Sequence, residues 1–182
     1  PLHFDFFSWS DELSEEEIAK MQKLEKIGAF GLTEPNVGSG VAGGLETTCK
    51  FDGENWILNG QKKWIGNATF ADVIIIWARD VDSNQVKGFL VEKDNPGFKA
   101  EKMEDKMALR IVQNAIITLT DCKVAESDRL QNANSFKDTA NVLRMTRAGV
   151  AWQAVGCARG AYESALKYTK KKGEYHGQVN SI

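Results

Sequence analysis

Apolar residues at helical spacing mark a short first segment of the chain. Ser14 and Glu17 form a capping-box pattern at its start. The apolar positions that follow at intervals of three are Ile18, Met21 and Leu24. This spacing predicts one amphipathic helix that ends near Gly28. A single helix of this length is too short to form a domain by itself.

Residues 28–132 change to the pattern expected of β-strands. Residues 47–51 and 56–58 predict a hairpin, because Asp52 and Gly53 between them favour a tight turn. Further segments rich in β-branched or aromatic residues are 73–78, 88–91 and 116–119. Turn residues such as those at 95–97 separate these segments. We therefore expect an antiparallel β-sandwich or barrel.

A long helical pattern begins after Asn134 and continues to Gly173. The positions spaced by three or four residues are Phe136, Ala140, Leu143, Arg147, Val150, Ala154, Ala158, Ala161 and Ala165. Many small residues lie between them and allow another helix to approach closely, so we expect this helix to pack against partners. Together the three segments predict an α+β fold class.

Composition and charge exclude several classes of function. The formal net charge is −2 with both signs interspersed, which gives no basis for a nucleic-acid or membrane-surface partner. The chain has three cysteines without a CxxC pair and two histidines, so we predict no disulfide framework, no metal site and no Ser-His-Asp triad. Without a long apolar run or a secretory pattern, the sequence favours an intracellular protein.

Residues 38–43, GSGVAG, match the GxGxxG pattern of dinucleotide-binding folds. That motif requires a preceding strand and a helix that opens at the glycines, whereas the segment after this match has the pattern of another strand. We therefore reject a Rossmann site. Glycines at these positions would let backbone amides approach a polar ligand, although the spacing alone favours a surface turn between strands.

Two separated motifs resemble the acyl-CoA dehydrogenase and acyl-CoA oxidase superfamily: GLTEPNVGS at 31–39 and NGQKKWIGN at 59–67. The resemblance implies that the cofactor is FAD, that the first motif passes the flavin ring, and that the tryptophan of the second packs against it. The cofactor-binding residues it implies are Leu32, Thr33, Gly38, Ser39, Trp64, Ile65, Gly66 and Asn67. Without these neighbours, Trp64 could equally be a core residue at a strand end.

The same resemblance implies contacts with the acyl-CoA substrate. It places Ser39 near the thioester and assigns Arg144 and Arg147, in the stretch RMTRAGVAWQAVG, to the CoA portion. An arginine suits a phosphate because it donates two parallel hydrogen bonds. Spacing alone would favour solvent-facing helix arginines. Lys172 stands where the family has an arginine on a cofactor phosphate, and it retains the charge without the planar fork.

Within the superfamily, WIGNATFAD, LRIVQN and VAWQAVG are most similar to plant peroxisomal short-chain acyl-CoA oxidases. This implies a peroxisomal location, with the mitochondrial matrix as the alternative, and a homo-oligomer. It also implies an internally deleted and C-terminally truncated architecture. Residues 1–27 are then a remnant of the N-terminal helical domain, 28–132 the β middle domain, and 133–182 the start of the C-terminal helical domain.

Two hypotheses of function follow. The first is FAD-dependent α,β-dehydrogenation of a short-chain acyl-CoA to a trans-2-enoyl-CoA, as in fatty acid β-oxidation; the residues do not decide between oxidase and dehydrogenase. The family's catalytic base is a glutamate on a later helix, so we assign no catalytic residue in this chain and reject Glu163, which lies in the middle of a helical pattern. The second hypothesis is a non-catalytic remnant that acts as an interaction or oligomerisation module.

Overall fold

The computed structural model describes residues 14–38 and 44–176. The chain divides into two compact units, Pro1–Val142 and Leu143–Ile182. The first unit contains the sheet and the second contains most of the long helix.

Helix α2 spans Glu15–Gln22 and confirms the predicted capping box. The Ser14 hydroxyl accepts a hydrogen bond from the Glu17 amide at 3.2 Å, and the Ser14 amide donates to the Glu17 carboxylate at 3.3 Å. The helix ends earlier than predicted. Leu24 adopts a φ of 60°, a left-handed conformation that stops the helical hydrogen bonding before the next strand begins at Gly28.

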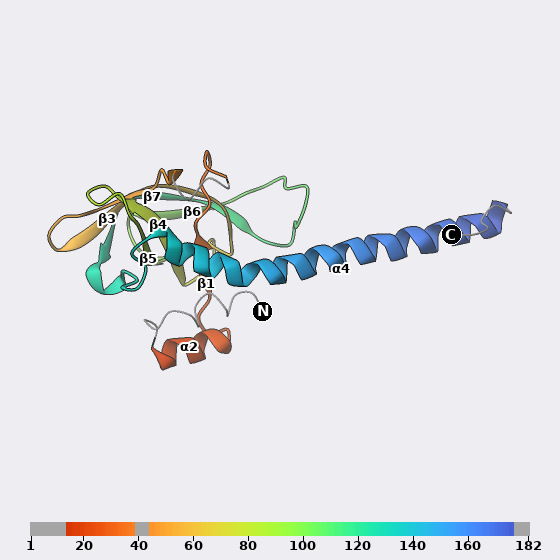
Figure 1. Cartoon of the computed structure of the whole chain (residues 1–182), viewed down its shortest axis with the longest axis horizontal. Helices are drawn as coiled ribbons and strands as arrows, with labels where there is room; N and C mark the ends of the chain where they lie inside the picture. The colour runs from red at the N-terminus through yellow and green to blue at the C-terminus, as the bar shows by residue number, and fades with distance from the viewer. Residues whose placement is uncertain (1–13, 39–43, 177–182) are drawn as a thin grey trace. The chain divides into compact units, whose positions relative to one another are not determined.

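Seven strands form one curled sheet (Figure 1). Their bounds are Gly28–Gly31 (β1), Thr48–Phe51 (β2), Asn55–Gly66 (β3), Val73–Asp80 (β4), Val86–Glu92 (β5), Phe98–Lys102 (β6) and Asn114–Ala125 (β7). The strand order is β1-β4-β2-β3-β7-β6, and β5 pairs with β4. A short 3-10 turn, η1, follows at Glu126–Asp128.

The predicted hairpin is confirmed as β2 and β3, which pair antiparallel with Phe51 opposite Trp56. The Asp52 carboxylate closes the turn by accepting hydrogen bonds from the amides of Glu54 and Asn55, at 3.0 and 2.7 Å. The sheet is not wholly antiparallel, however, because β4 pairs in parallel with both β1 and β2. Strands β1 and β6 were not predicted: GAFG lacks β-branched residues and FKAEK is mostly polar.

The core of the first unit draws on most strands of the sheet. Strand β4, VIIIWARD, is buried along nearly its whole length. The fully buried residues with the largest apolar side chains are Phe89, Leu58, Ile74, Ile76, Ile117 and Val91. Alternate residues of β3 and β7 complete this cluster, as expected for strands with one face on a core. The predicted α+β class with a β middle domain is confirmed.

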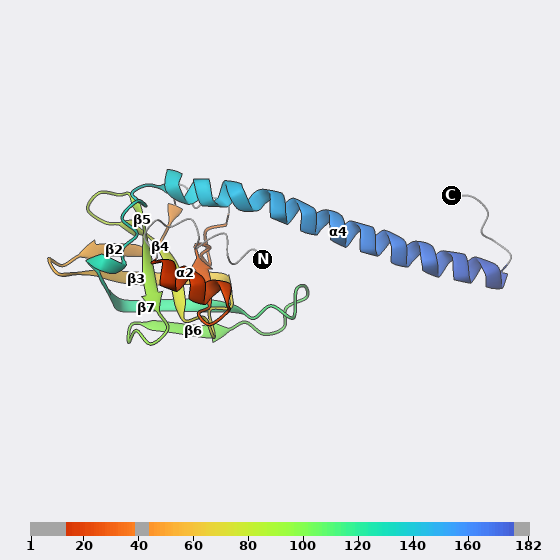
Figure 2. The ribbon, with the colours of Figure 1, turned by 90° about the horizontal axis from the view of Figure 1, so that it is seen from below.

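The predicted long helix is confirmed as α4, Phe136–His176 (Figure 2). Its start is fixed by the Asp138 carboxylate, which accepts hydrogen bonds from the amides of Asn134 and Ser135 at 3.1 and 3.0 Å. Among the residues described, no helix combines the length and apolarity needed to cross a membrane. In the same residues, no group of three or more His, Cys, Asp or Glu side chains could hold a metal ion.

Candidate functional site

The two motif segments lie side by side in the first unit. The Lys63 amide donates a hydrogen bond to the Thr33 carbonyl at 2.8 Å, and the Lys62 ammonium donates to the Leu32 carbonyl at 3.2 Å. The chain leaving β1 therefore runs along the second half of β3. Segments that are separate in the sequence thus form one continuous surface.

A buried ion pair fastens these segments together. Lys62 Nζ lies 2.8 Å from Glu34 Oε1, and neither side chain has exposed surface. The Glu34 carboxylate also accepts hydrogen bonds from the amides of Glu46 and Thr47, at 2.6 and 2.9 Å. A buried charge requires such partners, because an isolated ion in the interior is strongly unfavourable. The pair thus joins three stretches of chain: the segment after β1, the two residues before β2, and β3.

Burial and ion pairing shift the pKa values of Lys62 and Glu34 in opposite directions. Burial lowers the pKa of Lys62 to about 8, although the Glu34 carboxylate favours the charged ammonium. For Glu34, burial opposes the charged form, but Lys62 and the hydrogen bonds from Thr47 and Glu46 outweigh it and hold the pKa below its ordinary value. At neutral pH both groups are therefore charged.

The lowered pKa of Glu34 predicts an acid-sensitive contribution to stability. Because the folded pKa is lower than the unfolded one, the contribution is complete above the ordinary value of 4.5 and is lost as pH falls through the folded pKa. At pH 7 we expect Glu34→Gln to lower the free energy of unfolding by about 3 kcal/mol. Urea unfolding of both proteins at several pH values should show this difference shrinking below pH 4.5; an equal difference at pH 7 and pH 4 would contradict it.

Trp64 lies on a β-bulge that turns it away from the core. The register of β3 with β7 shifts between Lys62, opposite Ile117, and Ile65, opposite Ala115. Trp64 itself has a φ of 65°, and 52% of its surface is exposed. A left-handed conformation in a bulky residue is uncommon and is found at functional sites. The interpretation of Trp64 as a core residue is therefore wrong: its side chain is half exposed, and Lys63 Nζ lies over the ring, 5.5 Å from its centroid.

The three residues after Trp64 have different environments. Ile65 is buried and anchors the strand in the core. A Cβ atom added to Gly66 would meet only Val112 Cγ1, at 3.5 Å, so this position is open. Asn67 has a φ of 67° and turns the chain, since its carbonyl accepts hydrogen bonds from the amides of Phe70 and Ala71 at 3.0 and 2.8 Å.

In the first motif, Leu32 is buried, Thr33 is half-buried, and Gly38 is exposed with open space around it. Ser39 lies outside the described residues. The structure thus brings Leu32 and Thr33 next to β3, and the cofactor contacts of both motifs stay predictions.

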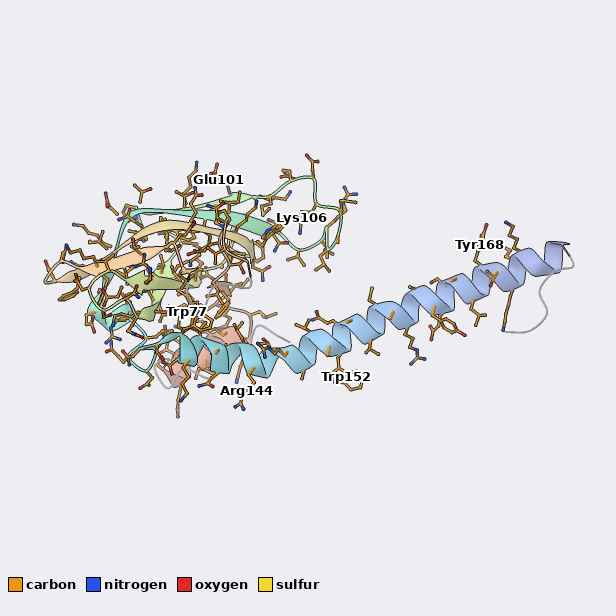
Figure 3. All side chains as sticks on the ribbon, turned by 45° about the horizontal axis from the view of Figure 1, so that its top comes forward. Trp77, Glu101, Lys106, Arg144, Trp152 and Tyr168 are labelled. Atoms are coloured by element: carbon orange, nitrogen blue, oxygen red, sulfur yellow. The ribbon has the colours of Figure 1, made fainter. Side chains whose placement is uncertain are left out.

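The positions predicted to contact CoA or a cofactor phosphate lie on α4. Arg144, labelled in Figure 3, Arg147 and Lys172 are all exposed and belong to the second compact unit. Their roles also stay predictions.

Sequence reasoning missed three residues that shape this site: Glu34, Lys62 and Asn114. The alternation along β3 offered a signal for one of them. Trp56, Leu58 and Lys62 fall on the same face of a strand, so a lysine continues an apolar series and must find a buried partner. Asn114, whose side-chain amide donates a hydrogen bond to the Trp64 carbonyl at 2.9 Å, gave no comparable signal, because this partner is 50 residues away in the sequence.

Comparison with known proteins places these observations in a family. Residues 29–122 match the model of the acyl-CoA dehydrogenase middle domain. The mitochondrial short-chain specific acyl-CoA dehydrogenase of Rattus norvegicus is 35% identical over 95% of this chain and 43% of its own length. The 3-(aryl)acrylate reductase of Clostridium sporogenes is 37% identical over 93% of this chain and 46% of its own. The chain thus spans less than half the length of these relatives.

A solved structure shares the fold. Glutaryl-CoA dehydrogenase from Mycobacterium smegmatis, in complex with FADH2, superposes with a TM-score of 0.83 and 35% identity over 93% of this chain and 43% of the enzyme. That complex confirms the flavin predicted for the family. The finer resemblance to plant peroxisomal oxidases finds no support in these relatives, which are a mitochondrial dehydrogenase, a bacterial reductase and a bacterial dehydrogenase. Because the middle-domain model matches more than half of the 182 residues, the chain belongs to the acyl-CoA dehydrogenase family.

Proposed function

We propose that this chain supplies the flavin-contacting and acyl-CoA-contacting β-domain of an enzyme that oxidises a short-chain acyl-CoA to a trans-2-enoyl-CoA. The observation that carries the proposal is the hydrogen bonding between the two motif segments, which joins Lys63 to Thr33 next to the exposed Trp64. When bound, FAD would supply the hydride acceptor. Within the two motifs, the residues that would bind the flavin and orient it are those named by resemblance: Leu32, Thr33, Gly38, Ser39, Trp64, Ile65, Gly66 and Asn67.

The residues at this surface fit a flat aromatic group. Trp64 offers a half-exposed indole on a bulge with a left-handed backbone, and aromatic rings gain from offset stacking. Thr33 next to it supplies a hydroxyl, and backbone donors of the first motif would favour a reduced, anionic ring. The buried Glu34–Lys62 pair lies behind this surface and fixes the separation of the two segments. By family resemblance, Ser39 would contact both cofactor and thioester, and Arg144 and Arg147 the CoA portion.

We assign no catalytic base within the described residues. Glu163, rejected from the sequence, forms an exposed ion pair of 2.7 Å with Arg159 one helical turn before it. Such an i,i+4 pair is ordinary for a solvated helix face. This supports the interpretation of Glu163 as a surface residue.

The names of the relatives support the finer parts of the proposal. The rat relative is specific for short chains and mitochondrial, so we propose a short-chain substrate and the mitochondrial matrix, the alternative location predicted from the sequence. A homo-oligomer remains part of the proposal.

A second candidate function is an interaction or oligomerisation module without turnover. The observation that favours it is the series of exposed apolar side chains on α4 within the second unit: Val150, Trp152, Val155, Tyr162 and Tyr168. Trp152 and Tyr168, both labelled in Figure 3, project from the helix. Exposed large apolar side chains are found at protein contact surfaces.

A titration with FAD separates the two candidates. We expect the 182-residue chain to bind FAD saturably, and Trp64→Ala to weaken binding about tenfold because stacking on the indole is lost. Trp152→Ala is the matched control, since it removes an exposed tryptophan from α4. Circular dichroism verifies that each variant is folded. A folded wild-type chain that does not bind FAD would reject the flavin-site proposal and favour the interaction module.

A further inference from the structure

We propose that Asn114, supported by Lys106, is the positioning residue that holds Trp64 in its outward conformation. The inference rests on the proposed flavin site, because it assigns the group that orients the indole face offered to the ring. Neither residue belongs to the two motif segments. Three contacts at the junction of β3, β7 and the loop before β7 support this role.

The first contact supplies a hydrogen bond at the bulge. The register of β3 with β7 omits Lys63 and Trp64, so the bulge interrupts the regular ladder there. The side-chain amide of Asn114 donates to the Trp64 carbonyl at 2.9 Å. A side chain thus bonds the main chain of Trp64, whose φ is 65°.

The second contact fixes Asn114 itself. It is the first residue of β7 and pairs with Gly66 of β3. On its other side, the Asn114 carbonyl accepts a hydrogen bond from the Met103 amide at 2.8 Å, just after β6 ends. The backbone of Asn114 is therefore held between two neighbouring strands, and its side chain starts from a rigid position.

The third contact orients the Asn114 amide. The Lys106 ammonium donates to Asn114 Oδ1 at 2.6 Å, to the Leu109 carbonyl at 2.8 Å, and to the Val112 carbonyl. An ammonium has three donors, and all three are used by these acceptors. With a cation at the oxygen, the amide nitrogen must face Trp64, and the polarised amide is a stronger donor. Lys106 is labelled in Figure 3, in the loop between β6 and β7.

The loop around Lys106 has little else to order it. Met107 is fully exposed, and Leu109 and Ile111 are 75% and 94% exposed. Since these apolar side chains bury almost nothing, the polar bonds of Lys106 are the main described interactions at the base of the loop. The same ammonium thus orders the loop and fixes the amide that bonds the Trp64 carbonyl.

The test compares Asn114→Ala with Asn59→Ala. Asn59 also links β3 to β7, through hydrogen bonds of 3.1 and 2.9 Å with Asp121, but it lies at the other register shift of these strands, between Leu58 and Gly60. Both variants therefore remove side-chain hydrogen bonds between β3 and β7, but only the bond of Asn114 is made to Trp64. Lys106→Met is the third variant, and it removes the cation while leaving Asn114 in place.

The first readout needs no flavin. The chain is labelled with 5-fluorotryptophan, and its Trp64 resonance is assigned by the loss of one 19F signal in Trp64→Phe. We expect this resonance to shift or broaden in Asn114→Ala, to change in the same direction in Lys106→Met, and to be unaffected in Asn59→Ala. An unchanged resonance in folded Asn114→Ala overturns the proposal, even in a chain that binds no FAD.

The second readout follows FAD. We expect Asn114→Ala to weaken FAD binding about fivefold, the effect of one lost hydrogen bond, and to raise the emission of the bound flavin because the indole quenches it less well. Asn59→Ala should bind like wild type. Equal loss in both variants would show a merely structural effect and would contradict the positioning role. Failure of the wild-type chain to bind FAD rejects the proposed function but leaves the 19F result to decide this inference.

Discussion

Replacing Lys62 by methionine should lower the free energy of unfolding by about 3–5 kcal/mol, the cost of leaving a buried charge without its partner. In the variant, the Glu34 carboxylate keeps only the hydrogen bonds from the amides of Glu46 and Thr47. The Leu32 carbonyl also loses its donor. We therefore expect the first motif to separate from β3 and FAD affinity to fall with stability. Urea unfolding and an FAD titration measure the two effects.

Lys93→Met provides the control for this substitution. Lys93 pairs with Asp72 at the same distance of 2.8 Å, but both side chains are substantially exposed, so we expect a change below about 1 kcal/mol. The double variant Lys62→Met with Glu34→Gln should recover part of the lost stability, because the glutamine carries no charge and its side-chain oxygen can still accept hydrogen bonds from the amides of Glu46 and Thr47. If Lys62→Met lowers the free energy of unfolding by no more than Lys93→Met does, the buried ion pair does not hold the two motif segments together.

The second large effect is expected for Gly60→Ala. Gly60 has a φ of 144°, and a Cβ atom there would lie 2.7 Å from Thr47 Cα and 2.8 Å from its Oγ1. Thr47 cannot withdraw easily, because its amide bonds Glu34 and its hydroxyl donates to the Gln61 carbonyl at 3.3 Å. The substitution therefore combines backbone strain with a clash against main-chain atoms. We expect it to destabilise the fold by about 3 kcal/mol.

Gly53→Ala separates the two causes. Gly53 also has a positive φ, of 106°, but nothing lies within 4 Å of an added Cβ atom. It should therefore show the backbone strain alone, about 1 kcal/mol. Denaturant unfolding of both variants gives the difference. Equal destabilisation would mean that the close approach of Gly60 to Thr47 contributes nothing, and would contradict the tight packing of β2 against β3.

The elements that were predicted correctly from the sequence are stabilised by residues close to one another along the chain. The Ser14–Glu17 cap and the Asp52–Gly53 turn are each made by side chains within three residues of the groups they bond. Such local chemistry is readable without a partner strand. The parallel pairing of β1 with β4 is different, because it joins residues 45 positions apart, such as Gly28 and Val73, and GAFG itself has no β-branched residue.

The site shows the same division between local and distant information. The two motifs could be recognised from their residues, but the bulge that exposes Trp64 depends on its register with β7. The partner of Lys62 lies in the other motif, and the group that bonds the Trp64 carbonyl is Asn114, fifty residues away. Since these contacts form only when the sheet closes, a single sequence could not assign them. The domain boundaries predicted at 27 and 132 stay a prediction.

The most direct test of the flavin site is the emission of FAD as the wild-type chain is added. If the two motif segments and Trp64 form the site, flavin emission falls to a plateau at saturation. With Trp64→Ala, emission should either not fall or reach its plateau only at a higher protein concentration. Emission that stays constant in the presence of a chain shown to be folded would contradict the account, because the paired motifs would then hold no flavin.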